Sequence, residues 1–108
     1  MKLFIVLFAS TLPCLCLAAE KGDLKAGAAV FATSCKTCHG AQGEGNPAIA
    51  KVLKTEIPNL GAKEVQDLSD EQLKTIVADG KGKMKPVKAV SGKQLDDVVA
   101  FIRSLAKP

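Results

Sequence analysis

The chain has 108 residues, of which 24% are charged and 4% are aromatic, and its formal net charge at pH 7 is +4. This length corresponds to a single small domain. So low a net charge, in a chain without tryptophan, tyrosine or a recognition motif, argues against a nucleic-acid-binding protein. A domain of this size buries little apolar surface, and such domains often need a metal, a cofactor or disulfides to stabilise the fold.

Residues 1–19 have the pattern of a secretory signal peptide. A lysine supplies a positive start, a long apolar run follows, and the run ends in Ala18 and Ala19 before a polar segment. We expect cleavage after one of these alanines and export to the periplasm, which leaves residues 20–108 as the mature domain. An uncleaved membrane anchor is the alternative, but the run is short for a bilayer span and Pro13 interrupts it.

A first helix is predicted from Asp23 into Cys35. Its apolar residues recur at i, i+3, i+4 and i+7, the spacing of one helix face; they are Leu24, Gly27, Ala28 and Phe31. The helix leads directly into the sequence "SCKTCHG", a C-x-x-C pair followed at once by the only histidine of the chain.

Three chemistries use a motif like that of Cys35, Cys38 and His39: a zinc site, a dithiol/disulfide couple and covalent haem attachment. A structural zinc site needs four nitrogen or sulfur ligands, and signal cleavage leaves no further Cys or His. A redox C-x-x-C of the thioredoxin kind lies in an α/β fold, and no sheet can be read in this sequence. The dithiol couple therefore stays only as an alternative.

C-x-x-C-H is the attachment motif of c-type haem. Two cysteines at this spacing lie on one side of a helical turn, so their sulfurs can bond to the two vinyl groups of one porphyrin. The adjacent His39 then directs its imidazole to the iron as the proximal ligand. We therefore expect one covalent haem c, held by Cys35 and Cys38, and attachment outside the cytoplasm agrees with the signal peptide.

Two further helices are predicted in the middle of the chain. Asn46 followed by Pro47 indicates an N-cap and a first helical residue, which open a short helix over 47–54. A serine and a glutamine at 69 and 72 form a capping box for a helix that carries Leu73, Ile76 and Val77 on its apolar stripe and ends at Gly80.

A loop over 79–90 leads to the last predicted helix. Ser91 with Gln94 repeats the capping-box pattern, and the apolar stripe that follows consists of Leu95, Val98, Val99, Ile102 and Leu105. No segment alternates with a period of two for long enough to predict a strand. The predicted fold class is all-α, with three main helices, short helices and loops wrapped round one haem.

Together these residues resemble the class I monohaem cytochromes c, the small bacterial periplasmic carriers, over nearly all of residues 23–106. The matching features are a glycine and an aromatic residue on the first helix, the C-x-x-C-H motif, a "PNL" segment, a methionine in a late loop and an aromatic residue on the last helix. The resemblance implies that the first and last helices cross near Gly27 and Phe101, where glycine permits a close backbone approach.

The resemblance also implies the other contacts of the haem. Met84, the only methionine left after signal cleavage, would be the distal iron ligand, although Lys85 stands where the family usually has proline. The His39 ring N–H would be donated to a proline carbonyl, that of Pro58 or, as an alternative, that of Pro47. Pro58 and Leu60 are expected to pack against the haem.

An iron with histidine on one face and methionine on the other has no open coordination position. The resemblance therefore implies a one-electron carrier between periplasmic or membrane redox partners, and not an enzyme. The alternative is a cytochrome c subunit of a larger dehydrogenase or oxidase.

Five lysines lie close to Met84 in the sequence: Lys81, Lys83, Lys85, Lys88 and Lys93. We expect them to form a positive rim that steers acidic redox proteins toward the haem. The expected protein is a monomer, with no nucleic-acid partner and no stable membrane insertion after signal cleavage.

Overall fold

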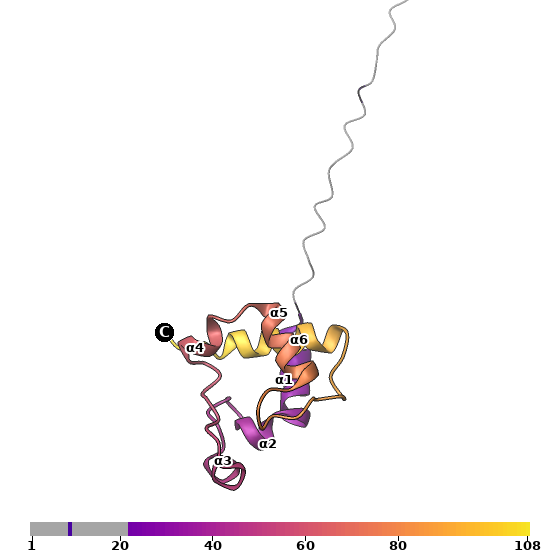
Figure 1. Cartoon of the computed structure of the whole chain (residues 1–108). Coiled ribbons are helices and arrows are strands. Elements are labelled where there is room, and N and C mark those ends of the chain that lie inside the picture. The colour runs from indigo at the N-terminus through magenta and orange to yellow at the C-terminus, as the bar shows by residue number, and fades with distance from the viewer. Residues whose placement is uncertain (1–8, 10–21) are drawn as a thin grey trace, which may run out of the picture.

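The structure, a computed structural model, describes residue 9 and residues 22–108, so the predicted signal peptide and its cleavage site lie almost entirely outside the described residues. The described part of the chain contains helices and no strand, which confirms the predicted all-α class (Figure 1). The helices are α1 (Leu24–Ser34), α2 (Lys36–His39), α3 (Pro47–Leu53), α4 (Lys63–Gln66), α5 (Asp70–Asp79) and α6 (Lys93–Ser104). Of the helices in this part, none has the length and apolar character that a bilayer span requires.

The first and last long helices cross at Gly27, as predicted (Figure 1). A Cβ atom on Gly27 would lie 1.8 Å from the backbone oxygen of Asp97 and 3.2 Å from the Cβ atom of Phe101. No side chain fits into that space, so glycine is what permits α1 and α6 to approach this closely. Next to the crossing, the rings of Phe31 and Phe101 pack with centroids 4.8 Å apart.

The apolar core lies between α1, α5 and α6. Phe31 of α1 and Val98 of α6 are its most buried large side chains, at 1% and 0% exposed. The other buried apolar residues are Cys35, Leu60, Val65, Leu73, Val77, Val90, Val99 and Ile102. Neither α2 nor α3 has a buried residue among its own positions, so the core is built almost without them.

Three of the predicted helix starts are confirmed. The Asp23 carboxylate accepts hydrogen bonds from two backbone N–H groups of the first turn of α1. The Asn46 side chain does the same for α3, with Pro47 as the first helical residue. Ser69 and Gln72 form the reciprocal capping box of α5.

The predicted capping box of the last helix is wrong. The N-cap of α6 is Gly92, whose φ is +55°, and no side chain caps this helix. The start is one residue later than Ser91, so the N3 position falls on Leu95, whose side chain cannot form a hydrogen bond. The separate short helices α2 and α4 were not distinguished in the sequence, because four residues are too few to display a helical period.

Candidate haem site

The three residues of the C-x-x-C-H motif lie together at the second helix, with Cys35 as its N-cap and with Cys38 and His39 as its last two residues. Cys35 ends α1 and precedes α2 with a non-helical backbone (φ −123°, ψ −31°), so the chain changes direction there. The Cys35 carbonyl then accepts hydrogen bonds from the N–H groups of Cys38 and His39, at 3.3 and 3.0 Å. This single turn places the two cysteines and the histidine on one short element.

Both motif cysteines are free thiols, Cys35 buried and Cys38 half-buried. Burial, and secondarily the neighbouring Cys38, raise the pKa of the Cys35 thiol to about 11. Cys35 is therefore a neutral thiol near neutral pH in the chain without a bound group. Within the described residues there is no group of three or more His, Cys, Asp or Glu side chains placed to hold a metal ion, so the three motif side chains do not form a preassembled zinc site.

His39 is half-buried, and its ring lies 6.5 Å from the ring of Phe31. Burial lowers the pKa of this imidazole below its usual 6.5, so the ring is neutral near pH 7. The neutral ring is the form that ligates a metal.

The Nδ1 atom of His39 is buried and has no hydrogen-bond partner among the described residues. The hydrogen bond that we expected from this ring atom to the carbonyl of Pro47 or Pro58 is thus not formed in this structure. An unpaired polar atom in the interior costs free energy, so buried groups nearly always have a partner. No hydrogen bond from Nδ1 fixes this imidazole, so the ring is available to a bound group such as the haem that the motif predicts.

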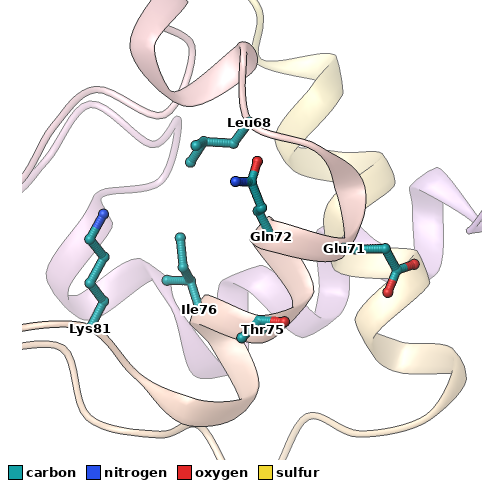
Figure 2. Close-up of a pocket in the computed structure, with 6 residues that line it drawn as sticks. All are labelled: Leu68, Glu71, Gln72, Thr75, Ile76 and Lys81. Carbon is teal, nitrogen blue, oxygen red and sulfur yellow. The ribbon is translucent and has the colours of Figure 1, made fainter.

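A surface hollow of about 350 Å³ runs along α5 (Figure 2). Its lining residues are Leu68, Glu71, Gln72, Thr75, Ile76 and Lys81. Gln72 and Ile76 are four residues apart on α5 and share one face of that helix, and Leu68 lies just before its N-cap. Figure 2 shows these three side chains on the same side as Lys81, while Glu71 points the other way. Leu68 and Ile76 are half-buried and supply the apolar side chains of this hollow, which none of Cys35, Cys38, His39 and Met84 lines.

The open face of α5 was not predicted from the sequence. The pattern placed Ile76 on one apolar stripe with Leu73 and Val77. In the structure Leu73 and Val77 are buried in the core, whereas Ile76 is half-buried and lines the hollow.

Met84 is half-buried in the loop that follows α5. Its backbone exchanges two hydrogen bonds with Lys81, each 2.9 Å long. Gly80 has a φ of +79°, and a Cβ atom there would lie 2.4 Å from the Met84 oxygen, so only glycine suits this tight turn. Since Lys81 lines the hollow, the turn that carries Met84 lies at one end of it.

The two residues proposed to pack against the haem differ in their surroundings. Pro58 is exposed. Leu60 is buried in the core, and its N–H donates to the Gly43 carbonyl at 2.8 Å. Whether either residue contacts a haem stays a prediction.

Comparison with known proteins identifies relatives of this chain. The family model described as "Cytochrome C oxidase, cbb3-type, subunit III" matches residues 22–102. The chain is 32% identical over 71 residues to cytochrome c-555 of Methylococcus capsulatus, an alignment that covers 64% of this chain and 50% of that protein. It thus spans about half the length of this curated relative.

Two solved structures that resemble this chain are also c-type cytochromes. A c-type cytochrome named KustC0563 superposes with a TM-score of 0.63 at 25% identity, covering 75% of this chain and 98% of the other. Cytochrome cL of Methylophaga aminisulfidivorans superposes with a TM-score of 0.57 at 26% identity, covering 77% of this chain and 53% of the other. All three relatives are named as cytochromes of the c type.

Proposed function

Because this chain belongs to the c-type cytochrome family described as cytochrome c oxidase, cbb3-type, subunit III, we propose that it is a one-electron carrier with one covalent haem. Membership of the family implies haem c. The observation that carries the proposal is the C-x-x-C-H turn, in which two free thiols lie beside a neutral imidazole with a buried, unpaired Nδ1 atom. When bound, the haem supplies reversible one-electron exchange.

The residues of the chain would divide the work as follows. Cys35 and Cys38 would anchor the haem covalently, and His39 and Met84 would hold its iron. Support for Met84 comes from its position on the turn that adjoins the hollow along α5. With both residues holding the iron, no open position would remain for a substrate, so the protein would act as a carrier and not as an enzyme.

The carrier would work in the periplasm, where it would meet acidic redox partners as a monomer. Lys81, Lys83, Lys85 and Lys88 are all exposed and surround the Met84 loop. Lys93 is different, because its ammonium group lies 2.9 Å from the Asp97 carboxylate and is partly neutralised by it. The other four lysines would therefore provide most of the attraction.

The electrostatic part of this proposal is tested by reversing charge. Changing Lys83, Lys85 and Lys88 to Glu should slow electron exchange with the native partner at low ionic strength. The defect should shrink as salt rises, because salt screens attraction between exposed charges. Equal rates for variant and wild type at every salt concentration would show that these lysines are only solvated surface.

The experiment that tests the carrier itself is an intact mass together with a visible spectrum of the purified, exported protein. We expect the mass of residues 20–108 plus one haem, which remains bound in denaturant and organic solvent because two thioether bonds hold it. A mass equal to the polypeptide alone, or to the polypeptide with a Cys35–Cys38 disulfide, would contradict the proposal.

A second candidate function is suggested by the description of the family model, which names an oxidase subunit. In that case the protein would be the cytochrome subunit of a larger dehydrogenase or oxidase. Gentle solubilisation followed by size-exclusion chromatography separates the two candidates. A free carrier elutes at its own small size, whereas a subunit elutes with its enzyme.

A further inference from the structure

The carbonyl groups of α2 are bonded by the loop that follows this helix. The Lys36 carbonyl accepts from the N–H of Gly40 at 2.8 Å, and the His39 carbonyl accepts from the N–H of Gly45 at 2.6 Å. The two carbonyls between them, those of Thr37 and Cys38, both accept from Asn46: from its side-chain Nδ2 at 3.1 Å and from its backbone N–H at 3.0 Å.

Asn46 simultaneously caps the next helix. Its Oδ1 atom accepts hydrogen bonds from the N–H groups of Ala48 and Ile49, at 3.0 and 3.4 Å. The two ends of one side-chain amide thus bond two different helices, with the NH₂ group on α2 and the oxygen on α3. Of the usual N-cap residues, only asparagine combines a donor and an acceptor in this fixed geometry.

The hydrogen bonds that the loop donates to the carbonyls of α2 are important for the orientation of this short helix. A helix of four residues is not stable by itself, since nucleation costs more than one turn returns. No residue of α2 or α3 is fully buried, although His39 is half-buried and Cys35, the N-cap of α2, lies in the core. The direction of α2, and with it that of the Cys38 and His39 side chains, therefore depends on the bonds to its carbonyls as well as on this limited packing.

We propose that Asn46 is a positioning residue of the haem site, which holds the attachment turn in the orientation that directs Cys38 and His39 to the haem. The proposal rests on the proposed function, because the group toward which α2 is oriented is the haem. The competing explanation is that Asn46 serves only as the N-cap of α3 and that its contact with Thr37 is incidental.

Asn46→Asp separates these explanations in the haem-loaded protein. Aspartate has the same shape and caps a helix as well as asparagine, but it replaces the donor to the Thr37 carbonyl with an oxygen that repels it. Asn46→Ala removes both interactions. Asp23→Ala is the matched control, because it removes the N-cap of α1 at the end remote from the motif.

Two measurements report the orientation of α2 in these proteins. In the oxidised protein, the paramagnetic shifts of the haem methyl protons depend on the orientation of the axial imidazole. Amide hydrogen exchange at Gly45 and Asn46 reports opening of the contact between the loop and α2. We expect Asn46→Asp to change the methyl shifts and to accelerate this exchange about tenfold, as expected for the loss of one hydrogen bond.

Asn46→Ala should change both measurements at least as much, and Asp23→Ala should change neither. If Asn46→Asp behaves like the wild type while Asn46→Ala does not, Asn46 is an N-cap only and the proposal is wrong. Wild-type behaviour of both variants would also overturn it. Failure of the proposed function is a separate result, because it would appear as a missing haem in the mass of the wild-type protein.

Discussion

Helices α1, α5 and α6 enclose an apolar core, whereas α2 and α3 have no buried residue of their own. In the first region, packing of Phe31, Val98 and their neighbours determines the arrangement. In the second region the chain is held by backbone hydrogen bonds around glycine-rich turns and by the two bonds of Asn46 to α2. The residues proposed to hold the haem lie largely in or beside this second region, at the edge of the core. We therefore expect the haem to contribute to the stability of the region around α2 and α3.

The largest expected effect on this contrast between the packed region and the region of α2 and α3 comes from removing the two cysteines that would bind the haem. Changing both Cys35 and Cys38 to Ala should yield a haem-free and largely unfolded chain, since the second region then has nothing to fold around and the remaining core is small. Far-UV circular dichroism of the exported protein measures the loss of helix. A cooperative, wild-type-like thermal transition of the haem-free variant would show that the core suffices and that our contrast is mistaken.

Met84→Ala is expected to have a smaller effect, confined to the iron. If the sulfur is the distal ligand, its removal should abolish the sulfur-to-iron charge-transfer band and permit cyanide or imidazole to bind. The reduction potential should fall, because a thioether favours the ferrous state.

Absorption spectroscopy, ligand titration and redox titration follow these changes. All three measurements are made near neutral pH. A spectrum and potential identical to those of the wild type would mean that another group holds the iron.

The smallest expected effect concerns the junction of α1 and α6 in the packed region. The Asp97 carboxylate is 5% exposed and accepts hydrogen bonds from the Lys93 ammonium group, at 2.9 Å, and from the Asp23 N–H, at 2.8 Å. These two bonds, that of Lys93 first, hold the pKa of Asp97 below its ordinary 3.8. The folded state therefore favours the charged form, and this contribution to stability is complete above pH 3.8 and is lost as the pH falls through the lower folded pKa.

Asp97→Asn should accordingly lower the stability at neutral pH, and its difference from the wild type should shrink in acid. Denaturant unfolding of both proteins across the acid range measures this difference, with the haem retained in each. A difference that stays constant down to the lowest pH would mean that the Asp97 charge does not contribute.

Much of the local structure could be predicted because it depends on residues close together in the chain. The N-caps Asp23, Asn46 and Ser69 bond to N–H groups two or three residues ahead, so their patterns are visible in the sequence. The C-x-x-C-H motif is equally local. The crossing at Gly27 involves partners seventy residues apart and was predicted only through the family resemblance.

Other features could be seen only in the tertiary structure, because they depend on residues far apart in the chain or on which of two neighbouring residues begins a helix. Ser91 had the pattern of an N-cap, but the positive φ of Gly92 marks a turn after which α6 starts one residue later. The amide of Asn46 could be assigned to α3 from the sequence, whereas its bond to Thr37, nine residues back, requires the glycine turns at 40, 43 and 45. Ile76 lines a hollow together with Leu68 and Gln72, whereas Leu73 and Val77 of the same helix as Ile76 are buried in the core. Sequence periodicity identifies the faces of a helix, but the partners available in three dimensions determine which face is buried and which remains open for a ligand.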